Sequence, residues 1–216
     1  MHETVKNLLK IEENIKSKFS NNVRKPKIIA VSKTFKMDHI KHLIEYGHRD
    51  YGENKVQEAN EKWCEIKKNK NISLHLIGGL QSNKVKIAVK LFDYIHSLDS
   101  IKLANKIAVQ EKELNKKVKL FIQVNIGNEK QKYGVDKKEL FEFYNYCKNI
   151  ELNIIGLMCI PPFDEPSEKY FREVQELNNK LKLNELSMGM SSDYIKAIKN
   201  GSTHIRIGSN IFGSRN

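Results

Sequence analysis

Eight short segments rich in β-branched and aromatic residues recur along the chain, and helical patterns separate most of them. We expect strands at residues 27–32, 49–52, 73–78, 94–98, 118–125, 153–158, 185–189 and 204–208. Strands that alternate with helices are typical of βα units and a parallel sheet. Eight such units in 216 residues predict an α/β fold, a single (β/α)8 TIM barrel at the small end of its size range.

The segments between these strands repeat apolar residues at i, i+3 and i+4. Such patterns cover residues 39–47, 56–68, 100–114, 137–149 and 167–182, and an extra amphipathic helix at about 2–19 precedes the first strand. No linker rich in Pro, Gly and Ser divides the chain, so we predict one domain over residues 1–216. A doubly wound open sheet stays an alternative, because strand count alone does not show closure.

The net charge of the chain indicates which classes of partner it could bind. The chain carries 38 basic and 26 acidic residues, a net charge of +12, but its lysines are dispersed and form no Arg-rich block or nucleic-acid motif. We interpret this as a solvated surface that would attract a phosphorylated small ligand, and nucleic acid as a partner is disfavoured. Without a long apolar segment or a signal peptide, we expect no membrane partner and a cytoplasmic protein.

Three cysteines, Cys64, Cys147 and Cys159, form no CxxC pair. An odd number without metal-ligand spacing is typical of small apolar residues in a reducing compartment. We therefore expect neither a disulfide framework nor a metal site.

Lys33 ends the apolar run IIAVSK. It could simply extend its ammonium group into water, as strand-end lysines often do. Alternation instead places it on the face of Ile29 and Val31, at the carboxyl end of the first strand, where TIM barrels carry their functional sites. If that face points inward, the amine enters the mouth of the barrel.

Small and polar residues end the other strands. YGEN brings Asn54, while SMGMSSD and GSTHIRIGSNIFG bring Ser191, Gly208 and Ser209. Backbone N–H groups and hydroxyls beside a glycine can bind an anion, so these last three residues predict a phosphate cradle. Taken singly, each is also typical of an ordinary turn.

Arg206 lies inside an apolar strand between Ile205 and Ile207. A buried guanidinium must be hydrogen-bonded or paired, and a structural pairing with a strand-end carboxylate is one interpretation. The other is that Arg206 belongs to a site with Lys33 and the phosphate cradle. Such a site suits pyridoxal 5′-phosphate (PLP), whose aldehyde condenses with a lysine amine to a Schiff base.

Seven motifs stand together in the chain: AVSKTF, YGEN, HLIGGLQSNK, QVNIGNEKQKYGV, GLMCIPP, LSMGMSSD and GSTHIRIGSNIFG. In order and spacing they resemble the pyridoxal phosphate homeostasis protein family, which is similar to the barrel domain of alanine racemase. The resemblance runs from about residue 28 to residue 214. It departs at Gly79, where the family usually has proline, and at Gln131, where a hydroxyl residue is common.

The resemblance implies a fold type III PLP-binding barrel. It implies that Lys33 carries the cofactor as a Schiff base and that Arg206 faces the pyridine nitrogen. It further implies that the phosphate lies against Ser191, Gly208 and Ser209, with Asn54 and Met158 near the ring.

The function implied is that of a non-catalytic protein of vitamin B6 homeostasis, which buffers intracellular PLP or delivers it to PLP-dependent apoenzymes, and which we expect to be a monomer. Racemisation needs an acid–base group on each face of the substrate carbon. Lys33 is one such group, and Tyr133 and Tyr194 are conceivable second ones. In the racemase family a tyrosine from an additional β domain serves, and we expect no such domain here because the sequence ends at Asn216.

Alternatives remain open. One is a racemase-type PLP enzyme with weak activity, and another is a barrel that binds phosphate or nucleic acid without Schiff-base chemistry. A second, weaker phosphate site could also lie on the clustered lysines Lys130, Lys132, Lys137 and Lys138.

Overall fold

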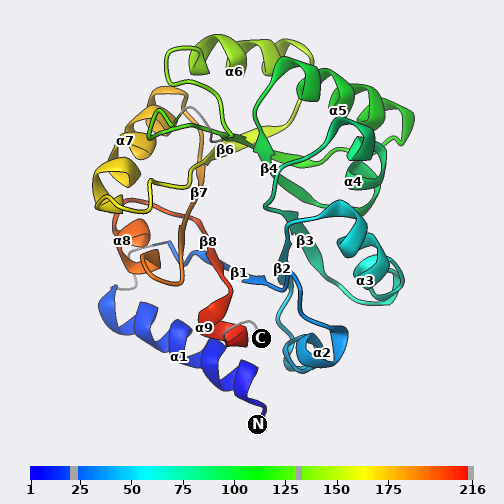
Figure 1. Ribbon diagram of the computed structural model, residues 1–216, viewed down its shortest axis with the longest axis vertical. Coiled ribbons are helices and arrows are strands. Elements are labelled where there is room, and N and C mark those ends of the chain that lie inside the picture. Colours follow the sequence, from blue (N-terminus) through cyan, green and yellow to red (C-terminus); the bar gives the residue numbers. More distant parts are fainter. Residues whose placement is uncertain (20–23, 130–132, 214–216) are drawn as a thin grey trace.

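The computed structural model describes residues 1–19, 24–129 and 133–213, and its centre is a closed barrel of eight parallel strands (Figure 1). Each strand pairs with the next, and β8 returns to β1. This closure confirms the predicted TIM barrel over the open sheet. The strands are β1 (Lys27–Val31), β2 (Asp50–Glu53), β3 (Ser73–Leu76), β4 (Tyr94–Leu98), β5 (Lys119–Gln123), β6 (Ile154–Met158), β7 (Glu185–Met190) and β8 (His204–Ile207).

Helices surround the barrel and bury their apolar faces against the outer side of the strands. They are α1 (Glu3–Lys18), α2 (Met37–Tyr46), α3 (Val56–Asn69), α4 (Val85–Leu91), α5 (Ile101–Glu113), α6 (Leu140–Asn149), α7 (Ser167–Lys180), α8 (Tyr194–Lys199) and α9 (Ser209–Phe212), with a 3-10 turn at Ser82–Lys84. The sequence patterns did not predict α4, α8 and α9, because helices of seven residues or fewer show little periodicity. None of the helices in the described ranges has the length and hydropathy required to cross a membrane.

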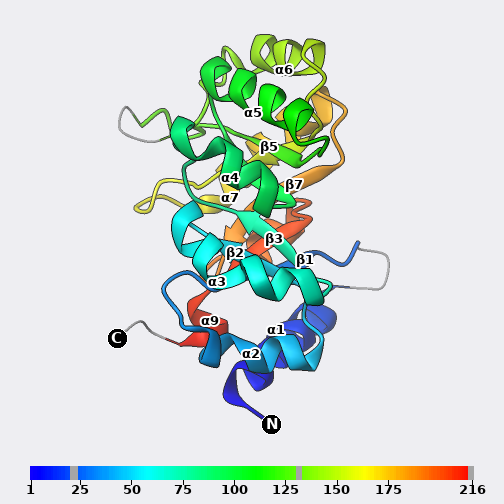
Figure 2. The same ribbon diagram turned by 90° about the vertical axis from the view of Figure 1, so that its right-hand side faces the viewer.

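The N-terminal helix α1 is an addition to the barrel. Its buried side chains include Val5, Leu8, Ile11 and Ile15, spaced by three or four residues so that they share one face. That face lies beside α2 and α9 (Figure 2). Asn7 Nδ2 also donates a hydrogen bond of 3.2 Å to the carbonyl oxygen of Ile211, so α1 supports the segment that follows β8.

The interior of the barrel is aromatic and polar. The rings of His75, Tyr94, His96, Phe121 and His204, from four different strands, contact one another inside it. His75 stacks on Tyr94 with centroids 4.2 Å apart, and His96 stacks on Phe121 at 4.4 Å. TIM barrels usually fill this space with Val, Ile and Leu. Buried polar groups require hydrogen-bond partners, so the contents of this barrel have to be arranged more strictly than an aliphatic core.

A bulge in β7 leads the chain into the mouth of the barrel. Ser187 is opposite His204, but Met190 is opposite Arg206, so β7 contains one residue more than β8 over this stretch. Gly189 lies within the bulge with φ of +92°, a left-handed conformation that favours glycine.

The three cysteines are buried or half-buried, as expected for small apolar residues. Cys147 and Cys159 are buried and Cys64 is half-buried, and none is in a disulfide. Burial raises the pKa of Cys147 and Cys159 to about 12, which keeps both thiols protonated.

Candidate functional site at the mouth of the barrel

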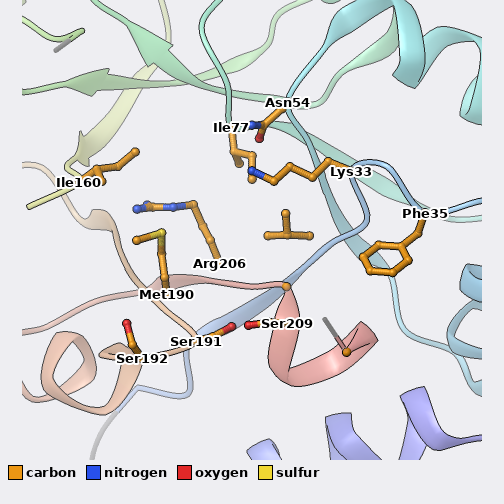
Figure 3. A pocket seen from close by; sticks show the side chains of 13 residues that line it. Lys33, Phe35, Asn54, Ile77, Ile160, Met190, Ser191, Ser192, Arg206 and Ser209 are labelled. Carbon is orange, nitrogen blue, oxygen red and sulfur yellow. The ribbon is translucent and has the colours of Figure 1, made fainter. Parts of the chain in front are cut away.

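A cavity of about 570 Å³ opens at the carboxyl ends of the strands (Figure 3). Six of the seven predicted site residues line it: Lys33, Asn54, Ser191, Arg206, Gly208 and Ser209. They come from segments up to 176 residues apart in the sequence, as positions 33 and 209 show. The barrel therefore brings the predicted lysine, arginine and phosphate cradle together.

Met158, the seventh, does not line the cavity. It is fully buried inside the barrel, where it packs against Tyr94 and Phe121. Strand β6 reaches the site through the two residues that follow: Cys159 offers its carbonyl oxygen to Arg206, and Ile160 forms part of the cavity wall.

Lys33 stands in a turn rather than in the strand, because β1 ends at Val31. The preceding residue, Ser32, is held from two sides. Its hydroxyl donates to Glu53 Oε1 over 2.8 Å, and Lys62 Nζ donates to its carbonyl oxygen over 2.9 Å. Glu53 is fully buried and also accepts hydrogen bonds from Lys62 Nζ and Trp63 Nε1, at 3.0 and 2.9 Å. A buried carboxylate thus fixes the backbone just before the lysine.

The residue after Lys33 is held as well. Thr34 has φ of +70°, which is unusual for a β-branched residue, and its backbone N–H donates to Glu58 Oε1 over 2.6 Å. Burial raises the pKa of Glu58, but the bonds from Thr34 and Lys62 outweigh it, and the pKa falls below its usual value. Glu58 and Lys62 both belong to α3, so this helix clamps the turn on both sides of Lys33. We call the group of Glu53, Glu58 and Lys62 the turn clamp.

Arg206 is 5 % exposed and reaches the cavity from β8. Its Nη1 donates to Ser187 Oγ over 2.7 Å and its Nη2 to the carbonyl oxygen of Cys159 over 2.9 Å. In the described part of the chain no carboxylate forms an ion pair with Arg206, so the structural pairing that the sequence left open is not observed. Burial lowers the pKa of Arg206, but the group stays cationic because a guanidinium titrates far above neutral pH.

Small residues form the wall next to Arg206. Ser191, Ser192, Gly208 and Ser209 line this side of the cavity, and Figure 3 shows the Ser191 and Ser209 side chains in the same part of it. Asn210 ties the two loops together, since its Nδ2 donates to the Ser191 carbonyl oxygen over 3.0 Å. A Cβ on Gly208 would make only ordinary contact with Val31, at 3.5 Å. The missing side chain therefore leaves room in the cavity rather than relieving a clash.

Sequence reasoning missed part of the lining, namely Val31, Phe35, Ile77, Ile160, Met190, Ser192 and Gly213. Most of these are apolar and carry no chemical signature of a site. Phe35 could be placed only with the structure, where its ring stacks on Phe212 of α9 with centroids 5.0 Å apart. The role of Glu53 was also missed, although it stands in the YGEN motif.

The cavity is poor in groups that can transfer protons. Among its described lining residues, Lys33 and Arg206 are the ones with titratable side chains. Tyr194 is buried beneath α1 and accepts a 2.6 Å hydrogen bond from Asn14 Nδ2, so it does not face the cavity. Tyr133 is exposed and lines a neighbouring cleft, where it lies near Gly79. Neither tyrosine lines the cavity that contains Lys33.

The structure describes only part of the suggested second phosphate site on the clustered lysines. Lys130, Gln131 and Lys132 lie outside the described residues. Lys137 pairs with Glu173 of α7 at 2.8 Å, which neutralises one of the remaining charges.

Comparison with known proteins shows the family to which the chain belongs. The family model for the alanine racemase N-terminal domain matches residues 7–216. The pyridoxal phosphate homeostasis protein of Aquifex aeolicus is 39 % identical over 199 residues, covering 88 % of this chain and 87 % of that protein. PipY of Synechococcus elongatus, solved with PLP bound, superimposes with a TM-score of 0.86 at 33 % identity, covering 97 % of this chain and all of PipY. Alanine racemase of Clostridium difficile shares the fold alone, at 15 % identity and a TM-score of 0.74 over 99 % of this chain and 57 % of the racemase. The chain therefore belongs to the pyridoxal phosphate homeostasis protein family, and its barrel is an alanine racemase N-terminal domain.

Proposed function

We propose that this protein binds PLP at the mouth of its barrel, as a Schiff base on Lys33, and that it buffers or delivers the cofactor without catalysing a reaction of its own. The observation that carries the proposal is one cavity that contains both Lys33 and Arg206 beside a wall of serine and glycine residues. We further propose that it acts as a cytoplasmic monomer and that PLP-dependent apoenzymes receive the cofactor.

The donor set fits the cofactor. Lys33 supplies the amine that an aldehyde requires, and Ser191, Gly208 and Ser209 offer hydroxyl and backbone groups to a phosphate. Arg206 can only donate hydrogen bonds, so a pyridine nitrogen in contact with it would stay unprotonated. Asn54 and Ile77 lie beside the Lys33 side chain (Figure 3), where Asn54 offers a polar contact and Ile77 an apolar one. A volume of about 570 Å³ lies within the range of small-molecule sites.

Among the described lining residues, no carboxylate, histidine or tyrosine accompanies Lys33, which supports a role without catalysis. Racemisation requires groups on opposite faces of the reacting carbon, and beside Lys33 the described lining offers only the guanidinium of Arg206. An unprotonated pyridine also withdraws electrons weakly, which disfavours carbanion chemistry. Binding and release are then the processes that this site serves best.

The test is chemical trapping. Protein saturated with PLP should turn yellow, keep its colour through dialysis, and after borohydride reduction carry one label on the peptide that contains Lys33. Lys33→Ala should lose both colour and label, while Lys36→Ala, three residues away and outside the cavity, should keep both. Arg206→Glu should shift the absorbance band of the bound cofactor.

Three outcomes would contradict the proposal. A label on another lysine would move the site, and no label at all would favour a barrel that binds phosphate or nucleic acid without this chemistry. Exchange of the α-protons of amino acids at turnover-like rates, abolished by Lys33→Ala, would make the protein an enzyme of racemase type.

A further inference from the structure

A continuous line of polar side chains runs from Arg206 through the interior of the barrel to its opposite end. Arg206 Nη1 lies 2.7 Å from Ser187 Oγ, and Ser187 Oγ lies 2.8 Å from His96 Nδ1. His96 Nε2 lies 3.0 Å from His75 Nδ1, and His75 Nε2 lies 3.0 Å from Asp50 Oδ1. The residues come from β8, β7, β4, β3 and β2 in turn. We call these five residues the barrel relay.

The relay is buried over most of its length. Ser187, His75 and His96 are fully buried, and the Asp50 side chain is 20 % exposed at the amino-terminal end of β2. Nothing in the proposed cofactor site requires two buried histidines, and an aliphatic interior would be the usual content of the barrel. Buried polar groups that are partly satisfied are unfavourable, so the relay needs one consistent arrangement of its hydrogen atoms.

Arg206 at one end of the relay can only donate hydrogen bonds and the Asp50 carboxylate at the other end can only accept them, so the positions of the hydrogen atoms between them are determined. Arg206 can only donate, so Ser187 Oγ accepts from it and directs its own hydrogen to His96 Nδ1. His96 then carries its hydrogen on Nε2 and donates to His75 Nδ1. His75 in turn carries its hydrogen on Nε2 and donates to the Asp50 carboxylate.

The reverse direction fails at both ends. It would leave the Ser187 hydrogen without an acceptor in the described interior, and it would set the unprotonated Nε2 of His75 against a carboxylate oxygen. Burial lowers the pKa of both histidines, while for Asp50 the bond from His75 and the charge of Lys27, 3.7 Å away, outweigh burial and lower its pKa. Two neutral imidazoles and an ionised Asp50 are what the selected direction requires.

We propose that Ser187, His96, His75 and Asp50 are positioning residues for Arg206, which hold its guanidinium in the cofactor cavity and place its counter-charge at the far end of the barrel. A carboxylate beside Arg206 would neutralise it and repel a phosphorylated ligand. The relay stabilises the buried cation through a chain of polarised hydrogen bonds and leaves the cavity cationic. The part of this inference that concerns PLP rests on the proposed function.

The arrangement of hydrogens can be tested without cofactor. In ¹⁵N-labelled protein at neutral pH, long-range proton–nitrogen NMR spectra should show His75 and His96 as neutral Nε2–H tautomers. His75→Gln and His96→Gln assign the signals. An Nδ1–H tautomer or an imidazolium at either position would overturn the relay.

Variants of the relay residues test whether the relay influences Arg206. Asp50→Asn and Ser187→Ala should each weaken PLP binding about tenfold, because each disturbs a hydrogen bond that involves a charged group. Both should also shift the absorbance band of bound PLP and broaden the guanidinium NMR signals of Arg206. Glu185→Gln is the matched control, because Glu185 lies at the same end of the barrel, 3.5 Å from His204 Nδ1, but outside the relay. It should leave the tautomers, the affinity and the absorbance band unchanged.

The outcomes separate the two proposals. If the wild-type protein shows both tautomers and the two variants show the guanidinium response, but the wild-type protein binds no PLP, the proposed function fails and the relay stands. If PLP binds on Lys33 and Asp50→Asn alters stability alone, with tautomers, affinity and absorbance unchanged, the relay is a structural feature and the inference fails.

Discussion

At the scale of single residues, Gly189 shows how one missing side chain shapes the site. It lies between Ser187, which bonds Arg206, and Ser191 in the cavity wall. A Cβ at this position would lie 2.5 Å from Cβ of Ala197 and 3.0 Å from Cα of Tyr194, so α8 packs directly on the glycine. Both the left-handed φ of +92° and this close approach exclude a side chain.

Gly189→Ala should therefore lower the free energy of unfolding by more than the unfavourable φ alone would lower it. Gly47 is a matched control, because it has a similar φ of +99° and nothing within 4 Å of an added Cβ. We expect Gly47→Ala to reduce stability by about 1 kcal/mol and Gly189→Ala by about 3 kcal/mol or more. Urea denaturation measures both. Equal losses would mean that α8 moves aside freely and that the contact is unimportant.

At the scale of elements, α3 positions Lys33 through the turn clamp. Left-handed φ at a β-branched residue is unfavourable by roughly 1–3 kcal/mol, so Thr34 needs compensation from its surroundings. Glu58 offsets this cost, because it accepts a hydrogen bond from the Thr34 N–H and forms a 3.1 Å ion pair with Lys62.

Glu58→Ala should release the turn, lower the free energy of unfolding by about 1 kcal/mol and weaken PLP binding several-fold. Glu61→Ala is the control, since Glu61 lies on the same helix and contacts Gln57 rather than the turn. We expect the free energy of unfolding of this variant to stay within about 0.5 kcal/mol of the wild-type value. Urea denaturation and PLP titration measure the two effects. An identical response of the two variants would show that Lys33 is held in some other way.

The same turn shows what the sequence could and could not predict. The strand at 94–98 was predicted to the residue and the other strands to within a few residues, because apolar runs bounded by turns carry a local signal. Lys33 was rightly placed at the mouth of the barrel, but the turn that presents it depends on side chains from α3. No local pattern encodes a contact between Glu58 and Thr34, which are 24 residues apart.

Met158 and the interior histidines show the same limit. The resemblance places Met158 near the cofactor ring, yet the residue lies in the packed layer below the cavity. His75 and His96 stand in runs that read as strands, and alternation predicts that they point to one face. Their mutual contact, 21 residues apart in the sequence, follows from the pairing of β3 with β4.

At the scale of the whole molecule, a barrel filled with neutral histidines should be sensitive to acid. Burial lowers the pKa of His75 and His96, and it lowers the pKa of His204 to about 2. The unfolded chain binds protons on these imidazoles as the pH falls below about 6.5, whereas the folded chain does not. Stability is therefore complete above that pH and is lost as the pH decreases. A histidine whose folded-state pKa lies well below 5.5, such as His204, should remove about 1 kcal/mol of stability between pH 6.5 and pH 5.5.

Urea denaturation at pH 8.5, 7.5, 6.5 and 5.5 measures this dependence. The free energy of unfolding should change little between the two highest values and fall steeply between the two lowest. His204→Phe removes one of these titrating groups and none of the hydrogen bonds of the barrel relay. Its free energy of unfolding should therefore fall less steeply below pH 6.5 than that of the wild-type protein, whatever its stability at neutral pH. A slope equal to that of wild type would mean that His204 is protonated in the folded barrel. Since its ring lies edge-on to Phe121 at 5.0 Å, such a charge would require water in a space that side chains now fill.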